Sequence, residues 1–248
     1  MKKLEYKNYD LVINLTPFIN IIGTQASGKT YFLRNLINKV NNDNIYIDDK
    51  PINSYDIEFL RKHVAAVLQT QEFKTEYVKE ELLYYQKLIN ISEDAAYKNI
   101  QDFVKFFGLE DMIESKIKYL TTYEQAYIKI LSLLIIRPSI LGIDDLLTYL
   151  KIEEKMKIIK YAKENNITIL NVTTNSEELL FGTDIIIMDN YHVVAYDKTE
   201  NILANNKTLL KLGMNEPFIV EMSTNLNYYD LLQKKYFDMK ALVGELWK

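Results

Sequence analysis

The sequence has no cysteine and only two histidines, His63 and His192. The absence of cysteine excludes disulfides, zinc–thiolate sites and thiol catalysis, and two histidines are too few for a metal site built from imidazole ligands. Long apolar runs are also missing, because the longest, residues 130–136, is far shorter than a bilayer span and is followed by Arg137 and Pro138. The N-terminal stretch MKKLEYKNYD lacks the apolar core of a signal peptide. We therefore expect neither a signal peptide nor a transmembrane segment.

A strong charge of one sign is absent as well. The formal net charge is −4, with 26% charged and 48% hydrophobic residues. This composition is typical of a globular protein, and the lack of a basic field argues against a nucleic-acid partner. The length of 248 residues suits one α/β domain with an insertion, or two domains of modest size.

Two of the seven glycines lie in the segment IIGTQASGKT, residues 21–30, which fits the phosphate-loop pattern G-x-x-x-x-G-K-[ST]. The predicted loop consists of Gly23, Thr24, Gln25, Ala26, Ser27, Gly28, Lys29 and Thr30. Its glycines let backbone N–H groups turn toward phosphate oxygens, and the following helix adds the partial positive charge of its N-terminus. We expect Lys29 to reach the β- and γ-phosphates of a nucleotide, and the Thr30 hydroxyl to complete a Mg²⁺ shell.

The order of elements around this loop is that of an α/β core with a helical insertion. Strands are predicted at residues 10–15, 18–22, 44–47, 64–68, 139–144 and 167–172, with a hairpin over 184–196 that turns at Asp189-Asn190. Helices are predicted at 29–40, 54–63, 75–89, 92–108, 121–136, 150–165 and through most of the last fifty residues. Ser54 is the predicted N-cap of the second helix, with Glu58 a turn further on, and Gly108 is the predicted stop of the fourth. His63 is expected at a helix end and His192 in the hairpin.

The order downstream of the loop resembles that of an ABC-transporter ATPase, over almost the whole chain. Gln69 ends the strand VAAVLQ, a helical region follows, and the strand SILGIDD ends in Asp144 and Asp145. The resemblance implies a P-loop NTPase fold of the ABC-ATPase type, with an antiparallel β subdomain, a helical insertion and a helical C-terminal tail. It implies that Gln69 contacts Mg²⁺ and the attacking water, and that Asp144 holds Mg²⁺ through water. The expected cofactors are ATP and Mg²⁺.

The tail narrows the resemblance, because KLGMNEPFIVEMS (211–223) and YFDMKALVGELWK (236–248) look like the C-terminal segment of energy-coupling-factor (ECF) transporter ATPases. This implies a peripheral subunit on the cytoplasmic side of the cell membrane, paired with a second ABC ATPase subunit that is the same chain or a different one. The pair would act on a membrane T component, and through it on an S component that captures a vitamin or a trace metal ion. The S component chooses the solute in that family, so the solute stays open.

The domain boundaries follow from this resemblance. Residues 1–73 and 137–204 form the α/β core, residues 74–136 the helical subdomain, and residues 205–248 a C-terminal helical dimerisation segment. An amphipathic tail helix that packs on its own domain is the alternative interpretation of the last segment.

The signature segment departs from the family pattern, which is usually Leu-Ser-Gly-Gly-Gln. Counting back from Asp144 places it at Leu120, Thr121, Thr122, Tyr123 and Glu124. In the family this segment caps the γ-phosphate of the nucleotide on the opposite subunit. A tyrosine in place of glycine limits the approach of the backbone, and Glu124 puts a negative charge near phosphate. The resemblance therefore implies a poor cap.

Three further positions depart from the family. Asp145 stands where a glutamate polarises the attacking water, Thr174 where a switch histidine supports the γ-phosphate, and Lys151 where the D-loop has an aspartate. The Asp145 side chain is shorter by one methylene, and Thr174 carries no positive charge. We predict that the chain binds MgATP and hydrolyses it weakly at its own site, with Asp145, Gln69 and Thr174 in the catalytic positions.

Other interpretations stay open. A nucleotide-binding regulatory or structural module would share the phosphate loop and have no membrane partner. A small-molecule kinase needs arginines in its lid, and the sequence has none between Arg61 and Arg137. Tyr6 or Tyr9 could stack on adenine, with strand packing as the alternative. The helix face at residues 77–88 is either a partner-facing groove or a solvated surface.

Overall fold

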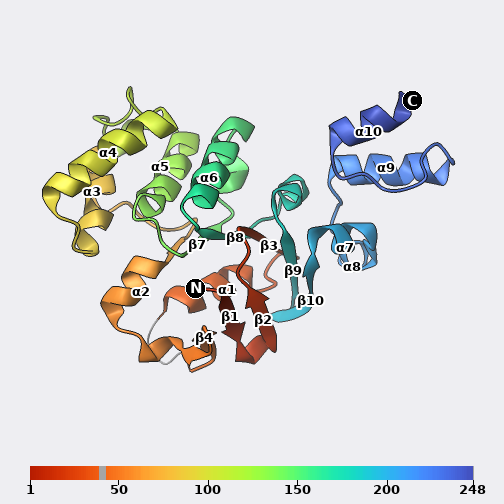
Figure 1. Ribbon diagram of the computed structural model, residues 1–248, viewed down its shortest axis with the longest axis horizontal. Helices are drawn as coiled ribbons and strands as arrows, with labels where there is room; N and C mark the ends of the chain where they lie inside the picture. Colours follow the sequence, from red (N-terminus) through yellow and green to blue (C-terminus); the bar gives the residue numbers. More distant parts are fainter. Residues whose placement is uncertain (39–42, 248) are drawn as a thin grey trace. The chain divides into compact units, whose positions relative to one another are not determined.

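The computed structural model describes residues 1–38 and 43–247 (Figure 1). The chain forms two compact units, each built from two segments. The first unit contains Met1–Pro17 and Thr30–Val172, and the second contains Phe18–Lys29 and Thr173–Lys248. Helix α1 (Lys29–Ile37) begins where the second unit's first segment ends.

An antiparallel sheet opens the first unit, with the strand order β2-β1-β4-β5. The strands are β1 (Lys3–Tyr6), β2 (Leu11–Asn14), β4 (Ile45–Ile47) and β5 (Lys50–Pro51). In β1 and β2, buried residues alternate with more exposed ones, and Leu4 lies opposite Ile13. This alternation is the period of two expected for a sheet with one face on the core.

Parallel strands form the second sheet element of this unit: β6 (Val64–Val67), β7 (Ile140–Asp144) and β8 (Thr168–Val172). Strand β7 lies between β6 and β8 and is buried along its whole length, as expected for a central parallel strand. Gly142 at its middle allows close packing, because a Cβ there would lie 3.0 Å from both the Ala66 Cβ and a Leu33 methyl carbon. The close packing fixes the end of β7, where Asp144 pairs in register with Val172.

The helices of the first unit follow the predicted periodicity. After α1 come α2 (Ile57–His63), α3 (Val78–Leu88), α4 (Glu93–Phe107), α5 (Thr122–Leu134) and α6 (Ile152–Glu164). Figure 1 shows α3, α4 and α5 grouped together, as the insertion between β6 and β7. Helix α4 ends at Gly108, whose φ of 73° is left-handed and whose N–H donates to the Val104 carbonyl at 2.8 Å.

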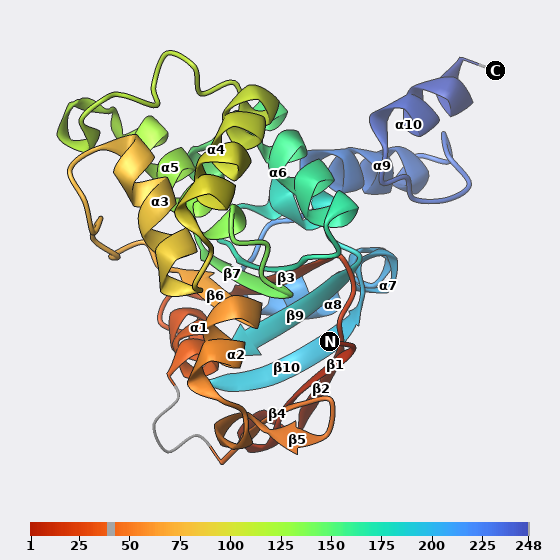
Figure 2. The ribbon, with the colours of Figure 1, turned by 60° about the vertical axis from the view of Figure 1, so that its left-hand side comes forward.

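The second unit contains strands β3 (Phe18–Gly23), β9 (Asp184–Asp189) and β10 (His192–Lys198), with β9 parallel to β3 and antiparallel to β10 (Figure 2). Its helices are α7 (Thr199–Ala204), α8 (Lys207–Lys211), α9 (Phe218–Tyr228) and α10 (Met239–Leu246).

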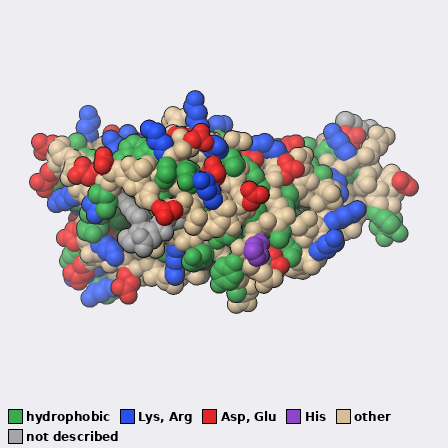
Figure 3. All heavy atoms as spheres, turned by 90° about the horizontal axis from the view of Figure 1, so that it is seen from below, with side chains coloured by type: hydrophobic (Ala, Val, Ile, Leu, Met, Phe, Trp, Pro, Cys, Tyr) green, Lys and Arg blue, Asp and Glu red, His purple; other side chains and the backbone are tan. Residues whose placement is uncertain are grey.

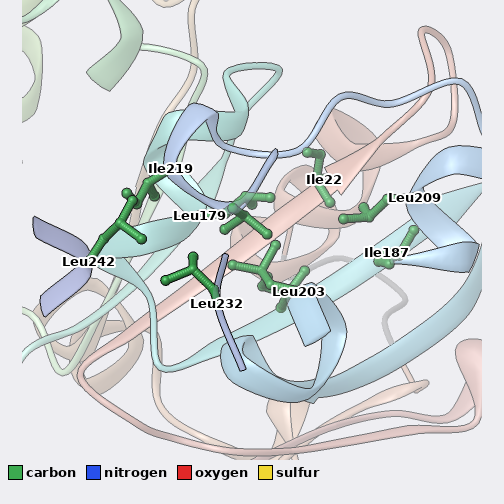
Figure 4. Close-up of a cluster of buried hydrophobic side chains, with 10 residues drawn as sticks. Ile22, Leu179, Ile187, Leu203, Leu209, Ile219, Leu232 and Leu242 are labelled. Carbon is green, nitrogen blue, oxygen red and sulfur yellow. The ribbon is translucent and has the colours of Figure 1, made fainter. Parts of the chain in front are cut away.

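An apolar cluster joins the tail of this unit to its strands (Figure 4). Ile219, Val220 and Leu242 of the tail are buried in one cluster with Leu179 and Ile187. These tail residues therefore pack on their own unit, and dimerisation by the segment 205–248 stays a prediction.

Charges of both signs are interspersed on the face drawn in Figure 3, in keeping with the small net charge of −4. None of the helices described at residues 1–38 and 43–247 combines the length and apolarity that crossing a membrane requires.

Most predicted elements are confirmed, and the errors lie at ends and in short strands. The helix predicted over 54–63 begins at Ile57, so the prediction of Ser54 as N-cap is wrong. Ser54 instead ends a 3₁₀-helix and donates its hydroxyl hydrogen to the Pro51 carbonyl at 2.7 Å. Strands β1 and β5 were not predicted. Helix α1 is described to Ile37, while residues 39 and 40 of its prediction and residue 248 of the tail lie outside the described residues.

Candidate functional site

The phosphate loop encloses the ammonium group of its own lysine. Lys29 Nζ donates to the Gly23 carbonyl at 2.9 Å, the Thr24 carbonyl at 2.7 Å and Ser27 Oγ at 3.1 Å. The Lys29 side chain is buried, at 8% relative exposure. A cation held at the centre of the loop provides the positive charge that a nucleotide phosphate needs there.

Both loop glycines are required by the local geometry. A Cβ at Gly23 would collide with the Met188 carbonyl of the neighbouring strand β9. Gly28 has a φ of 95°, a left-handed conformation that side chains rarely adopt. The loop therefore keeps the shape in which its backbone N–H groups can turn toward a ligand.

The predicted magnesium residues Thr30 and Asp144 lie together in the first unit. The Thr30 hydroxyl donates to Asp144 Oδ1 at 2.9 Å, and Asp144 is buried at the carboxyl end of β7. A hydroxyl and a carboxylate are the hard oxygen ligands that Mg²⁺ prefers. Mg²⁺ would take them together with nucleotide phosphate oxygens and water, since no group of three or more His, Asp or Glu able to hold a metal occurs at residues 1–38 and 43–247.

Asp145 directly follows this carboxylate with a strained backbone. Its φ is 53°, and its N–H donates to the Val172 carbonyl at 2.8 Å. Aspartate tolerates the left-handed region better than most residues with longer side chains. The hydrogen bond to Val172 of β8 holds the backbone of Asp145 in place, and with it the position from which the short carboxylate side chain extends.

Gln69 is held by two residues that were not singled out in the sequence. Its Nε2 donates to the Tyr149 hydroxyl at 2.9 Å, and its backbone carbonyl accepts from Lys129 Nζ at 3.1 Å. Burial lowers the pKa of Lys129 below its ordinary value. The Gln69 amide nitrogen is therefore engaged with Tyr149, and this bond restrains any shift of the side chain that would bring the amide oxygen to Mg²⁺.

The signature segment is tied to its own chain. Thr121 is the N-cap of α5 and forms a capping box with Glu124. The Tyr123 hydroxyl donates to the Glu154 carboxylate, which also accepts the Lys151 N–H at 3.0 Å. Burial, and then the Glu154 carboxylate, raise the pKa of Tyr123. Glu154 thus links the signature position Tyr123 to Lys151 at the D-loop position.

The neighbouring signature residues have simple local places. Leu120 follows a short 3₁₀-helix (Ile117–Tyr119), and its carbonyl accepts from Gln125 Nε2 at 3.0 Å. Thr122 is exposed at the first position of α5.

Thr174, at the switch position, lies in the second unit beside the phosphate loop. It is exposed and lines a hollow of about 270 Å³ together with Gln25, Ser176 and Asn215. The hydrogen-bonding side chains at this hollow are neutral hydroxyls and amides. They provide no cation of the kind that a switch histidine supplies.

The aromatic candidates for adenine are separated by burial. Tyr6 is fully buried, stacks on Phe32 with ring centroids 4.1 Å apart and donates its hydroxyl hydrogen to the Phe32 carbonyl at 3.4 Å. Stacking of Tyr6 on adenine is therefore wrong, because strand packing uses its ring. Tyr9 is half-buried at the edge of the same cluster, 5.4 Å from the Phe32 centroid, and remains the candidate.

The two histidines have the expected structural places. His63 is the last residue of α2, packs against Phe59 and shares a hydrogen bond with Ser139 Oγ at 2.9 Å. Burial lowers its pKa. His192 begins strand β10.

Sequence reasoning missed the supporting residues Tyr149, Glu154, Asp189 and Tyr191. The structure brings each of them to a motif that is distant in sequence, as in the hydrogen bond from the Thr24 hydroxyl to Asp189 Oδ1 at 3.0 Å. The only signal in the sequence was the hairpin turn predicted at Asp189-Asn190. That turn is one residue early, because β9 ends at Asp189 and β10 begins at His192, so the turn residues are Asn190 and Tyr191.

Comparison with known proteins gives relatives over the whole chain. The chain is 24% identical over 258 aligned positions to the energy-coupling factor transporter ATP-binding protein EcfA1 of Mesomycoplasma hyopneumoniae, covering all of this chain and 93% of that protein. It is 23% identical to EcfA1 of Ligilactobacillus salivarius, covering 97% of this chain and 88% of the relative. The resemblance of the tail to ECF ATPases thus agrees with the names of these relatives.

Solved structures show the same fold. CbiO1 of Clostridium perfringens, described as part of an ABC transporter complex, superposes with a TM-score of 0.70 at 19% identity, covering 88% of this chain and 97% of that one. An ATP-binding cassette solved as a dimer with ADP and phosphate gives a TM-score of 0.66 at 20% identity, covering 79% of this chain and 98% of that one. The predicted fold, a P-loop NTPase of the ABC-ATPase type, is therefore confirmed.

The family model described as "ABC transporter" matches residues 6–148, more than half of the chain. The matched range runs from β1 through the phosphate loop, Gln69 and the signature segment to Asp144 and Asp145. On this match the chain belongs to the ABC transporter family.

Proposed function

We propose that the chain is the MgATP-binding subunit of an ECF-type importer, and that its own site hydrolyses ATP slowly. The observation that carries the proposal is the phosphate loop, in which Lys29 is held by Gly23, Thr24 and Ser27. The Thr30–Asp144 hydrogen bond at 2.9 Å supports a magnesium site beside it. Phosphates replace the loop carbonyls as partners of Lys29 when the nucleotide binds.

The transport role rests on the relatives and on the tail. Binding of MgATP closes a pair of ATPase subunits, this chain with a second copy or a different one, and closure moves a membrane T component. The T component acts on an S component that holds a vitamin or a trace metal ion. The chain is peripheral on the cytoplasmic side of the membrane. The helical subdomain at 74–136 and the dimerisation segment at 205–248 are part of this proposal.

A membrane partner has a suitable surface in the first unit. An apolar hollow of about 190 Å³ lies beside the segment that follows Gln69, lined by residues that include Arg61, Tyr85, Leu88, Ile89 and Leu133. Tyr85 is anchored there by the Gln71 amide, which donates to its hydroxyl at 2.7 Å. The apolar lining favours a groove for a partner over a wholly solvated helix face.

Slow hydrolysis follows from the chemistry of the positions at which this chain differs from the family pattern. The Asp145 carboxylate is one methylene short for activating water, and Thr174 offers a hydroxyl where charge would stabilise the transferring phosphoryl group. The signature of this chain is also a poor cap for a partner's nucleotide, because Thr122 and Tyr123 replace the two usual glycines and Glu124 places a negative charge where the family has a glutamine. MgATP binding is retained and turnover is low.

The test uses the full chain, tagged and purified in detergent from its native membranes. Phosphate release from MgATP is measured beside a Lys29→Ala variant, and ATP binding is measured on both. We expect membrane subunits to co-purify with the tagged chain and MgATP to bind. The chain purified without its membrane subunits should hydrolyse ATP at less than about 1 s⁻¹. Turnover by the chain alone above that rate would contradict slow hydrolysis.

Two other outcomes separate the alternatives. If no membrane protein accompanies a chain that still binds MgATP, the nucleotide-binding regulatory module is correct. If Lys29→Ala leaves ATP binding unchanged, the phosphate-loop assignment itself fails.

A further inference from the structure

The tip of the β9–β10 hairpin lies against the phosphate loop within the second unit. The Tyr191 N–H donates to the Ser27 carbonyl at 2.9 Å, and the Thr24 hydroxyl donates to Asp189 Oδ1 at 3.0 Å. These two hydrogen bonds join both sides of the tip to the loop between its two glycines.

The Tyr191 ring covers the second loop glycine. A Cβ built on Gly28 would lie 2.7 Å from Tyr191 Cδ1 and 3.1 Å from Cγ, so the ring packs directly on the glycine's α carbon. Tyr191 as a whole residue remains 55% exposed. The Tyr191 ring therefore covers one side of Gly28, and a ligand can approach this glycine only from its other sides.

The backbone of Tyr191 is unusual for a tyrosine. Asn190 and Tyr191 have φ values of 45° and 62°, the pair of positive angles that a type I′ hairpin turn requires. Glycine or asparagine occupies such a position with less strain than an aromatic residue. The strained conformation is offset by what the ring does, namely its packing on Gly28.

We propose that Tyr191 is a positioning residue for nucleotide binding, whose ring holds the phosphate loop in its binding conformation. The proposal rests on the proposed function, because it concerns the loop that binds MgATP. The ring restricts Gly28, and the hydrogen bond from the Tyr191 N–H to Ser27 fixes the residue before it. A loop without this support samples other conformations, and the fraction able to bind phosphate falls.

The position of Tyr191 predicts which ligands are affected. Tyr191 packs on Gly28 and bonds Ser27, which belong to the part of the loop that every bound nucleotide uses, so its loss should weaken every nucleotide that places a phosphate in the loop. ATP and ADP should lose affinity by the same factor. A residue that contacts only the γ-phosphate would instead weaken ATP alone.

The test compares MgATP and MgADP binding by calorimetry, with thermal melting of each protein. Tyr191→Asn removes the ring and keeps a residue that tolerates a positive φ. Tyr191→Gly removes the whole side chain, also tolerates a positive φ, and is the second variant should the first fold poorly. Tyr191→Phe keeps the ring. Tyr97→Asn is the matched control, since Tyr97 is 41% exposed on α4 and lies outside the phosphate loop and the dimerisation segment.

We expect Tyr191→Asn and Tyr191→Gly to weaken MgATP and MgADP binding equally, each by about tenfold, with a melting temperature near that of the unaltered chain. Tyr191→Phe and Tyr97→Asn should bind both nucleotides within about twofold of the unaltered chain. Unchanged binding by both ring-free variants would overturn the proposal, and so would a loss confined to MgATP or an equal loss in Tyr191→Phe. Failure of the unaltered chain to bind either nucleotide would instead refute the proposed function, and this proposal with it.

Discussion

Thr121 and Glu124 satisfy one another at the start of α5. Glu124 Oε2 accepts hydrogen bonds from the Thr121 N–H and from its hydroxyl, both at 2.8 Å, while the Glu124 N–H approaches Thr121 Oγ1 at 3.3 Å. The acidic residue at the last signature position therefore has a structural use, as part of a capping box. Its carboxylate occupies the N-terminus of the helix that the resemblance assigns to a partner's γ-phosphate.

Removing the Glu124 side chain should cost stability in a pH-dependent way. The hydrogen bonds from Thr121 lower the pKa of Glu124 from its ordinary value of 4.5. A lowered pKa in the folded state stabilises the fold above the unfolded pKa, and this stabilisation is lost as pH falls through the folded value. Glu124→Ala should lower the free energy of unfolding by about 1 kcal/mol at pH 7 and by much less below about pH 4.

Urea unfolding at several pH values checks this prediction. Thr122→Ala is the control, because Thr122 is exposed beside the cap and outside the capping box. Its effect should stay within about 0.5 kcal/mol at every pH. A stability difference for Glu124→Ala that does not change with pH would show that the charged carboxylate is not what stabilises the cap.

The two acids at the end of β7 should respond differently to loss of charge. Asp145→Asn keeps the size and the tolerance of left-handed φ that this position needs, at 53°, and removes only the basic oxygen. If Asp145 still activates water, residual turnover should fall at least about tenfold while MgATP affinity stays within about threefold. Asp144→Asn should weaken MgATP binding, because Asp144 accepts from Thr30 at the expected magnesium site.

Phosphate release and equilibrium binding on the same preparations distinguish the two effects. Equal turnover by Asp145→Asn and the unaltered chain would mean that Asp145 does not serve as the base, and that the slow hydrolysis uses another route.

The hydrogen bond between Gln69 and Tyr149 should oppose the role of Gln69 at the nucleotide. Gln69 Nε2 donates to the Tyr149 hydroxyl at 2.9 Å, and this bond restrains the movement that would bring the amide oxygen to Mg²⁺. One hydrogen bond contributes about 0.5–1.5 kcal/mol, so Tyr149→Phe should strengthen Mg²⁺-dependent ATP binding by about two- to tenfold. Tyr119→Phe, at a tyrosine with 77% exposure, is the control and should change nothing. Weaker binding in Tyr149→Phe would mean that Tyr149 helps to present Gln69.

The sequence predicts the phosphate loop and the main elements because their signals are local. The spacing of Gly23, Gly28 and Lys29, and the apolar run before Asp144, depend on neighbours in the chain. The strand β5 has only two residues and therefore no period that a sequence pattern could detect. The start of α2 at Ile57 is an element boundary, which local patterns define less well than the element itself.

The contacts that support the site could not be predicted from such local patterns. Tyr123 was interpreted only as an obstacle in the signature, yet its hydroxyl bonds Glu154 of α6, thirty-one residues away in sequence. The contacts of Tyr149 with Gln69 and of Tyr191 with Ser27 join residues that are even farther apart in sequence. Pairings of this kind arise from tertiary packing, which no local pattern in one sequence specifies.

The C-terminal tail has a buried residue, Leu242, and an exposed aromatic residue, Trp247, and substitutions at the two should affect stability differently. Leu242 is fully buried in the apolar cluster with Leu179 and Val220, whereas Trp247 is 85% exposed. Leu242→Ala should therefore destabilise the fold by about 2–5 kcal/mol, by loss of burial and creation of a cavity. Trp247→Ser should change the free energy of unfolding by no more than about 0.5 kcal/mol.

If residues 205–248 also dimerise, Trp247→Ser should lower the amount of ATPase partner that co-purifies with the tagged chain, by about tenfold or more at limiting concentration, because exposed tryptophans are common anchors of interfaces. Val12→Ser, at a residue that is 43% exposed in β2, is the control for loss of an exposed apolar side chain and should leave the partner in place. An unchanged yield of partner with Trp247→Ser would show that Trp247 does not anchor subunit pairing.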